Sequence, residues 1–405
     1  MRPLASAFLL LLAAAGLALA AGSHRVAAQS SGETSPEIAD DLAALRQMAL
    51  SDDAALLDRM IGQMIMVGFL GHDERDQGVA AVRDQLAQGV IGGVVLYPEN
   101  IRSARQLRNL TALLLNAKSE LVPLIAVDQE GGLVQRLTRR NGYVYFPSAR
   151  NVGRDPKLRT EDGALRLYGR MAKELASAGI NLNFGPVVDL NTNPANPVIG
   201  RRKRSFGSDP KTVTELARAF IIAHRDANVL TSPKHFPGHG SSRSDSHKVL
   251  PDISRTWRES ELDPYRLLAK EGLLDMVMVG HLYHPRFSDG ETVPTSLSAR
   301  AISALRAKGY IGFHGVVVSD DMEMGAVRKA YTVPERAVMA INAGTDIIVF
   351  SNVISKDAGL GPKIHAAILE AVRDGRISRA RIEQAYGRIL LLKRRLMQHD
   401  LPGKW

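Results

Sequence analysis

The chain has 405 residues, of which 45% are hydrophobic, and it contains no cysteine. This length suits one large α/β barrel or two ordinary domains, and the lack of cysteine excludes a disulfide framework, a thiolate metal site and a lipidated cysteine. The formal net charge of +10 favours acidic partners. Because no arginine-rich helix and no basic strand interleaved with aromatic residues stands out, a nucleic-acid partner is not expected.

Residues 1–28 predict a secretory signal peptide. Arg2 supplies a positive charge, residues 4–21 are apolar, and the small residues ending at Ala20 and Ala28 offer cleavage sites. The alternative is an uncleaved N-terminal anchor, because the apolar run is nearly long enough to span a bilayer. Either segment would place the rest of the chain outside the cytoplasm, in the periplasm or the medium. No later stretch predicts a membrane span.

Residues 29–55 predict a linker and an N-terminal helix, followed by a single domain over 56–400. Residues 29–36 are rich in Ser, Gly and Thr, which is typical of a tether. Amphipathic helices are then predicted over 38–50 and 52–61, with Ser51 as the N-cap of the second.

Beyond this point, apolar runs of strand length alternate with helical stretches. Each run is continuously apolar, as expected for parallel strands covered on both faces. Eight such units predict a (β/α)8 TIM barrel, with an open doubly wound sheet as the alternative. The runs cover residues 64–69, 91–97, 124–128, 180–188, 229–232, 276–280, 315–319 and 345–350. Helical segments include 103–119, 162–178, 210–227, 298–308 and a final basic helix over 379–396.

Polar and ionisable residues gather where the predicted strands end. In a barrel these ends meet on one face, so residues distant in sequence share one pocket, whereas an open sheet would spread them along an edge. This pattern favours the barrel. The segments concerned are Asp128–Gly132, Val188–Asn191, Lys234–Gly240, Gly280–His284 and Ser319–Met322.

The loop Lys234–Leu250 carries the densest group of candidate residues. Its proline and glycines disfavour a helix. Asp245 and His247 are two residues apart, so their side chains point the same way in extended backbone. The carboxylate could hold the tautomer of the imidazole and leave its other nitrogen free to exchange protons. The alternative is a surface loop in which Asp245 only makes an Asx-turn.

Two aspartates follow the apolar run over 315–319. An aspartate that ends a buried strand is desolvated and needs a reason to be there. Asp320, nearer the strand, could act as a nucleophile that attacks an anomeric carbon and forms a glycosyl-enzyme ester. The alternative is an N-cap of the following helix. Asp321 is expected to be the structural member of the pair.

Asp128 and Arg136 are candidates for binding a sugar. A buried carboxylate can accept two sugar hydroxyls, and the glycines at 131 and 132 let a backbone come close. The alternative is a structural ion pair between Asp128 and Arg136. The basic cluster over 201–204 is a solvated loop in the simplest interpretation. In the other, Arg204 enters the pocket while its neighbours attract an anionic substrate.

His235 and His239 have the spacing of a helical zinc site. A proline and a glycine lie between them, however, and no further ligand has a plausible spacing, so neither a metal nor another cofactor is expected. Lys234 and His235 are interpreted as hydroxyl donors to a substrate. His281 and His284 are interpreted as pocket lining or packing.

Together these motifs resemble the single-domain β-N-acetylglucosaminidases of glycoside hydrolase family 3, the NagZ-like branch. The resemblance runs from about Met60 to Leu396. KHFPGHG followed by DSH separates this branch from the two-domain β-glucosidases, which take a catalytic glutamate from a C-terminal domain. The segments that carry the resemblance are Ile61–Phe69, Ala126–Gly132, Asn183–Asp189, Arg204–Gly207, Lys234–Gly240, Asp245–His247 and Ser319–Asp321.

The resemblance implies a retaining double displacement on a TIM barrel. The aspartate nucleophile of the family falls on Asp320. Its acid/base, an Asp–His pair on the mobile loop after strand 5, falls on Asp245 and His247. The sugar-binding positions of the family fall on Asp128, Arg136, Arg204, Lys234 and His235, and a pocket methionine falls on Met324.

Two features depart from the family pattern: residues 202–203 look inserted, and a signal peptide is unlike the cytosolic recycling members. The usual substrate, an internalised anhydro-muropeptide, therefore does not follow. We predict an exported, cofactor-free, monomeric enzyme that removes non-reducing terminal GlcNAc from peptidoglycan fragments or chitooligosaccharides. The alternatives are a β-glucosidase or a GlcNAc phosphorylase on the same barrel, and an inactive glycan-binding protein of the cell envelope.

Overall fold

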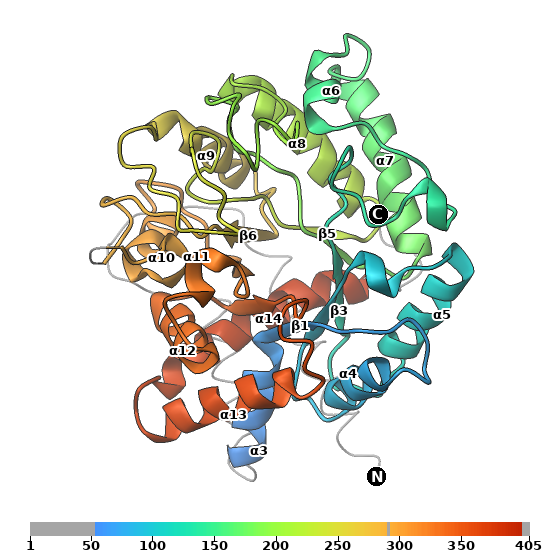
Figure 1. Ribbon diagram of the computed structural model, residues 1–405, viewed down its shortest axis with the longest axis vertical. Coiled ribbons are helices and arrows are strands. Elements are labelled where there is room, and N and C mark those ends of the chain that lie inside the picture. Colours follow the sequence, from blue (N-terminus) through green and yellow to red (C-terminus); the bar gives the residue numbers. More distant parts are fainter. Residues whose placement is uncertain (1–52, 290–291, 399–405) are drawn as a thin grey trace, which may run out of the picture. The chain divides into compact units, whose positions relative to one another are not determined.

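The computed structural model describes residues 53–289 and 292–398 (Figure 1). The predicted signal peptide or anchor, the tether, the helix over 38–50 and the N-cap Ser51 lie outside these residues. Among the helices that are described, none is both long and apolar enough to cross a bilayer.

All eight predicted strands are present, each within the run that predicted it except β7, which continues two residues beyond its run, to Asp321. Their residues are buried almost throughout, because helices cover the outer face of the sheet and neighbouring strands fill the inside. Two of the strands have only two residues. The strands are β1 (Ile65–Gly68), β2 (Gly93–Leu96), β3 (Leu124–Val127), β4 (Leu182–Asn183), β5 (Leu230–Thr231), β6 (Met276–Val279), β7 (Val316–Asp321) and β8 (Ile347–Phe350).

The sheet is parallel and follows the order β5-β4-β3-β2-β1-β8-β7-β6. Strand β1 pairs with both β2 and β8, so the first and last strands are neighbours. Met66, for example, lies opposite Gly93 on one side and Val349 on the other. This pairing, together with the contact between the segment after β5 and strand β6, confirms the barrel and excludes the open doubly wound sheet.

The segment that follows β5 closes the barrel against β6. The backbone N–H of Phe236 donates to the carbonyl of Met278 at 2.9 Å, and its carbonyl accepts from the N–H of Gly280 at 2.9 Å. The N–H of Met278 donates to the carbonyl of Pro233 at 3.0 Å. Residues 233–236, which include two of the predicted site residues, therefore form the seam of the barrel.

Helices surround the strands (Figure 1). Their first turns follow the cap signals of the sequence: Ser103 accepts from the N–H of Gln106 at 3.2 Å, and Asp209 accepts from the N–H of Thr212 at 2.9 Å. The α-helices are α3 (Asp53–Gln63), α4 (Gln77–Ala87), α5 (Ala104–Leu115), α6 (Ala149–Arg154), α7 (Glu161–Ser177), α8 (Pro210–Arg225), α9 (Asp263–Lys270), α10 (Ala299–Arg306), α11 (Gly325–Arg328), α12 (Val333–Ala343), α13 (Leu360–Arg373) and α14 (Arg379–Gln398). Short 3-10 turns cover Pro98–Asn100, Arg139–Asn141, Glu259–Leu262 and Thr295–Leu297.

A buried lysine of α14 lies at the N-terminal ends of the strands. The Nζ of Lys393 donates to Gln63 Oε1 at 2.6 Å and to the carbonyl of Gly92 at 2.9 Å. The side chain is buried and has no carboxylate partner among the described residues, so burial lowers its pKa to about 7.

Candidate active site

A cavity of about 590 Å³ lies at the C-terminal ends of the strands. In a barrel this end collects side chains from loops that are far apart in sequence. Every residue predicted to act in catalysis or in substrate binding lines it. These residues are Asp128, Arg136, Arg204, Lys234, His235, Asp245, His247, Asp320 and Met324.

One wall of the cavity is a chain of alternating charges. Lys234 Nζ contacts Asp128 Oδ1 at 2.7 Å and Glu130 Oε1 at 2.8 Å. Arg204 forms two hydrogen bonds of 2.8 Å to the two oxygens of Glu130. Arg136 contacts Asp128 Oδ2 at 3.2 Å. Each side chain is held by at least one charged neighbour, which fixes the wall before a substrate arrives.

The buried members of this wall stay charged near neutral pH. Burial alone would raise the pKa of Glu130, but Arg204 and Lys234 outweigh it and hold this pKa well below its ordinary value. Burial also opposes the charge of Lys234, and Asp128 and Glu130 outweigh it and raise the pKa of the lysine. The structural ion pair that the sequence left open between Asp128 and Arg136 is therefore present, and it is formed by residues that are predicted to bind the sugar.

His235 adds a buried imidazole to this wall. Its Nδ1 contacts Asp189 Oδ2 at 2.7 Å, and its backbone N–H donates to Asp189 Oδ1 at 3.1 Å. Its Nε2 lies 3.3 Å from a terminal nitrogen of Arg204. Because arginine only donates, Nε2 accepts this bond, and Nδ1 carries the proton that faces Asp189.

The two aspartates at the end of β7 have different surroundings. Burial raises the pKa of Asp320, but His235, His281 and the N–H of Asp321 outweigh it and bring the value to about 2. Asp321 instead accepts from the N–H groups of Glu323 at 3.0 Å and of Ser351 at 2.8 Å, and burial raises its pKa to about 6. Asp320 is thus an anion near neutral pH, while Asp321 binds backbone.

The alternative prediction that one of these aspartates caps the next helix is wrong. Helix α11 begins at Gly325, and its N-cap position is Met324. Asp321 is nevertheless the structural member of the pair, because its carboxylate joins the loops that follow β7 and β8.

Asp245 and His247 form a pair at the edge of the cavity. His247 Nδ1 contacts Asp245 Oδ1 at 2.8 Å, and the N–H of His247 donates to the same oxygen at 2.9 Å. The carboxylate therefore makes the Asx-type contact and holds the imidazole at the same time. The His247 side chain is 62% exposed, and its Nε2 has no partner among the residues that the structure describes.

Residues 56–392 match the family described as glycosyl hydrolase family 3 N terminal domain. The chain belongs to glycoside hydrolase family 3. This confirms the family that the motifs indicated.

This family 3 chain is similar to the following three proteins. It is 30% identical over 370 residues to a β-hexosaminidase A of Pseudoalteromonas piscicida, covering 84% of this chain and 61% of the relative. It is 39% identical over 282 residues to a β-hexosaminidase of Tolumonas auensis, covering 67% and 79%. The structure of a family 3 β-N-acetylglucosaminidase from Paenibacillus sp. str. FPU-7 matches it with a TM-score of 0.76 and 34% identity, covering 86% of this chain and 64% of that one.

The chain thus spans less than two thirds of two of these three proteins. Family and relatives together indicate a glycoside hydrolase of the β-hexosaminidase type. The solved neighbour also confirms the (β/α)8 fold.

Sequence reasoning gave no role in the site to three residues that contact the predicted site residues or their loop. Glu130 bridges Lys234 and Arg204, Asp189 holds His235, and His239 contacts the loop of the Asp–His pair. Glu130 and Asp189 stand in segments that the sequence marks as polar strand ends. Their partners, however, lie dozens of residues away along the chain.

His281 and His284 are predicted to line the pocket or to pack, and both lie in packing positions. His281 is buried, and its ring bonds Ser296 Oγ at 2.6 Å and the carbonyl of Asp321 at 2.9 Å, which supports the end of β7. His284 packs among the aromatic rings of Trp257 and Phe287.

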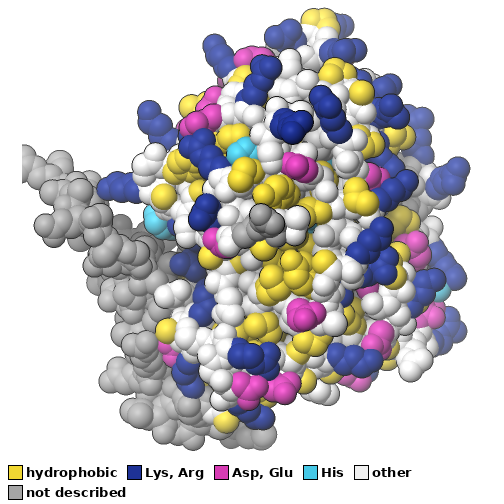
Figure 2. Space-filling model, turned by 60° about the vertical axis from the view of Figure 1, so that its left-hand side comes forward, with side chains coloured by type: hydrophobic (Ala, Val, Ile, Leu, Met, Phe, Trp, Pro, Cys, Tyr) yellow, Lys and Arg dark blue, Asp and Glu magenta, His cyan; other side chains and the backbone are white. Residues whose placement is uncertain are grey.

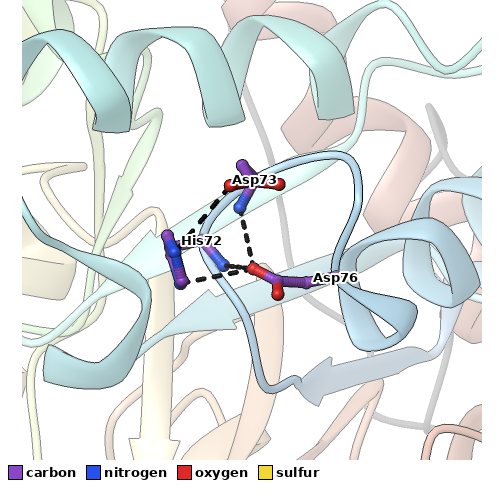
Figure 3. Close-up of side chains that lie close together, drawn as sticks. All are labelled: His72, Asp73 and Asp76. Carbon is purple, nitrogen blue, oxygen red and sulfur yellow. Dashed lines mark hydrogen bonds and ion pairs between the residues drawn. The ribbon is translucent and has the colours of Figure 1, made fainter.

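A group of possible metal ligands lies in the loop before α4 (Figure 3). His72 Nδ1 is 3.2 Å from Asp76 Oδ2, which also accepts the N–H groups of His72 at 2.8 Å and Asp73 at 3.1 Å. The Asp73 carboxylate binds Arg75. These hydrogen bonds account for the cluster as part of the loop, and the expectation that the enzyme needs no metal stays a prediction.

Proposed function

We propose that the chain is a retaining exo-β-N-acetylglucosaminidase. The observation that carries the proposal is the cavity itself, where an aspartate that stays ionised, Asp320, shares one pocket with a carboxylate–imidazole pair, Asp245 and His247. The names of the family 3 relatives support the N-acetylhexosaminide specificity.

In the first step, Asp320 attacks the anomeric carbon and forms a glycosyl ester. Protonated His247 gives its Nε2 proton to the departing glycosidic oxygen, and Asp245 stabilises the charged ring and holds its orientation. In the second step, neutral His247 takes a proton from water, which attacks the ester and releases GlcNAc and the Asp320 carboxylate. The charged wall of Asp128, Lys234 and its neighbours would bind the sugar hydroxyls through charge-assisted hydrogen bonds.

The mouth of the cavity suggests an acidic aglycone. Arg202 and Lys248 line the cavity and are exposed, and neither forms an ion pair with any described residue. Figure 2 shows Lys and Arg side chains spread over the face in view, with fewer Asp and Glu. We therefore favour carboxylate-bearing peptidoglycan fragments over neutral chitooligosaccharides. We also propose that the enzyme is a monomer that acts outside the cytoplasm; the predicted signal segment and the peptidoglycan substrate support this location.

The test is hydrolysis of chromogenic β-N-acetylglucosaminides by the wild type, Asp320→Asn and His247→Ala. Asp320→Asn should lower kcat by at least about a thousandfold, because the nucleophile is lost. His247→Ala should slow poor leaving groups on the order of a hundredfold and activated ones much less, because only poor leaving groups need a proton. Hydrolysis of glucosides instead of N-acetylglucosaminides would contradict the specificity, and turnover that requires phosphate would indicate a phosphorylase.

The aglycone preference has its own test. Arg202→Gln and Lys248→Gln should each raise KM for a muropeptide several-fold, and added salt should shrink this difference because it screens exposed charges. KM for chitobiose should not change. Equal effects on both substrates would contradict the acidic aglycone.

A further inference from the structure

His239 lies next to the loop that carries the Asp–His pair and has no part in the mechanism above. Its side chain is buried and does not line the cavity. Its Nδ1 contacts Ser242 Oγ at 2.7 Å, and its Nε2 contacts Ser246 Oγ at 2.9 Å. Ser246 stands between Asp245 and His247, so the ring is one side chain away from both.

His239 is itself fixed from several sides. Its N–H donates to Asp189 Oδ1 at 2.7 Å, and its carbonyl accepts from Asn196 Nδ2 at 2.7 Å. Its ring packs edge-on against His235, with 5.7 Å between centroids. Asp189 also holds the His235 ring. One buried carboxylate therefore anchors both the sugar-facing histidine and the support of the Asp–His loop.

The loop is held from the other side by the start of α11. The N–H of Gly325 donates to the carbonyl of His247 at 3.0 Å, and the N–H of Ala326 donates to the carbonyl of Ser246 at 3.1 Å. Within this part of the loop Ser246 is 1% exposed, whereas His247, Lys248 and Val249 are exposed. Ser246 is thus the buried point at which the loop joins the body of the enzyme.

We propose that His239 is a positioning residue, which acts through Ser246 to hold Asp245 and His247 where the imidazole can exchange a proton with the glycosidic oxygen. The proposal rests on the proposed acid/base role of His247. Both ring nitrogens face serine hydroxyls, which either donate or accept, so the neutral ring is satisfied in either tautomer. Burial lowers the pKa of His239 to about 4, which keeps the ring neutral near pH 7.

The first test compares Ser246→Ala with Ser241→Ala. Ser241 lies in the same loop and is buried, but its hydroxyl contacts Thr256 at 3.3 Å instead of His239. On a series of aryl β-N-acetylglucosaminides, Ser246→Ala should lower kcat/KM for the poorest leaving group on the order of tenfold, the loss expected for one hydrogen bond, and should spare the most activated one. Ser241→Ala should change kcat/KM by the same factor for every leaving group, so its dependence on the leaving group should match that of the wild type. The ratio of kcat/KM for the poorest leaving group to kcat/KM for the most activated one does not depend on the fraction of the enzyme that is folded.

A second pair of variants tests which of the two ring nitrogens of His239 is needed. The amide of His239→Gln can reach the position of Nε2 and keep the contact with Ser246, whereas that of His239→Asn reaches only the position of Nδ1. We expect His239→Gln to keep most of the wild-type ratio and His239→Asn to behave like Ser246→Ala. On activated substrates, where hydrolysis of the glycosyl ester limits kcat, His239→Asn should lower kcat but not kcat/KM, and added azide, which attacks the ester without a general base, should restore this kcat.

The outcomes are distinguishable. If His247→Ala shows the leaving-group dependence and Ser246→Ala does not differ from Ser241→Ala, the positioning role is wrong and the proposed function stands. If His239→Gln and His239→Asn have equal ratios, the positioning role is wrong as well. If His247→Ala itself lacks the dependence, the proposed acid/base role fails and this proposal fails with it.

Discussion

Glu130 is the residue on which the charged wall depends, because its carboxylate pairs with both Lys234 and Arg204. Removing the charge of Glu130 leaves two buried cations short of a partner, and such a loss costs about 3–5 kcal/mol. The same contacts hold the pKa of Glu130 below its ordinary value, so its contribution to stability is present above pH 4.5 and is lost as the pH falls toward the folded-state pKa.

We therefore predict that Glu130→Gln lowers the free energy of unfolding by about 3 kcal/mol at pH 7 and raises KM. Urea unfolding and steady-state kinetics measure the two effects. Glu215→Gln, in an exposed contact of 4.0 Å with Lys211, is the control and should change stability by less than about 1 kcal/mol. Equal losses in the two variants would contradict the role of Glu130.

The pKa of Glu261 is shifted in the direction opposite to that of Glu130. Glu261 is buried beside Asp189 and accepts the N–H of Leu190 at 3.1 Å, and burial, with the charge of Asp189, raises its pKa to about 8. The folded chain then binds more protons than the unfolded chain between about pH 4.5 and 8, so the contribution of Glu261 falls as the pH rises through this window.

Glu261→Gln should therefore stabilise the enzyme at pH 9 relative to the wild type and change little at pH 5, because glutamine keeps an acceptor for Leu190 without a buried charge. Thermal melts at the two pH values measure the difference. A Tm shift of the same size at both would contradict a titrating Glu261.

Glu130 and Glu261 show what could not be predicted from the sequence. The residues at strand ends were predictable, because a polar residue that directly follows a buried apolar run lies, in a barrel, on the face where the strand ends meet. Their partners were not. Lys234 and Asp128 are 106 residues apart, and Arg204 and Glu130 are 74 apart, so only the closed sheet brings them into contact.

At the scale of elements, the loop between β8 and α13 forms part of the cavity mouth. Glu323, just after β7, holds this loop: it accepts from Ser351 Oγ at 2.9 Å and from the N–H groups of Ile354 and Ser355 at 3.0 Å each. Val353 and Ile354 line the cavity, yet their side chains are exposed. The Glu323 carboxylate thus supplies hydrogen-bond acceptors for backbone N–H groups of the loop that lack a backbone acceptor.

Glu323→Ala should release this loop. We expect faster amide hydrogen exchange in residues 353–356 and a several-fold higher KM for long substrates than for aryl glycosides, because only long substrates reach the mouth. Glu335→Ala, which removes an exposed capping carboxylate from α12, is the control. Unchanged exchange in the loop would contradict the role of Glu323.

The predicted elements agree with the structure to within a few residues, except at β4. The apolar run over 180–188 predicted a long strand, but β4 ends at Asn183. Residues beyond it pair elsewhere, as Val187 does with Lys234. Apolar residues show that a segment is buried, but they do not show that it pairs in a sheet. The C-terminal end of β4 therefore could not be predicted from the sequence.

At the scale of the whole molecule, the two ends of the barrel have different tasks. The C-terminal ends of the strands hold the cavity, and the opposite end holds buried charges that join the outer helices to the sheet. Asp346 there binds Arg306 and Arg381 at 2.8 Å and Arg388 at 3.1 Å. This division is expected for the fold.

Lys393 is a cation at that end with no carboxylate partner among the described residues. Burial lowers its pKa to about 7 from 10.5, so the unfolded chain binds more protons between these values and the stability contribution of Lys393 rises with pH across that window. Lys393→Met should raise the free energy of unfolding by a few kcal/mol below pH 7 and by less near pH 10. Urea unfolding at pH 6 and pH 10 measures this, and a variant that is less stable at pH 6 would contradict it.

The seam over residues 233–236 restricts how this chain can vary in evolution. Side chains there can be exchanged while the backbone bonds to β6 persist, but an inserted or deleted residue would shift Lys234 and His235 and break the barrel wall at the same time. Changes of length are therefore expected in loops that do not close the sheet, such as the basic loop before Arg204. In a library of single-residue insertions, active members should be absent between 232 and 237.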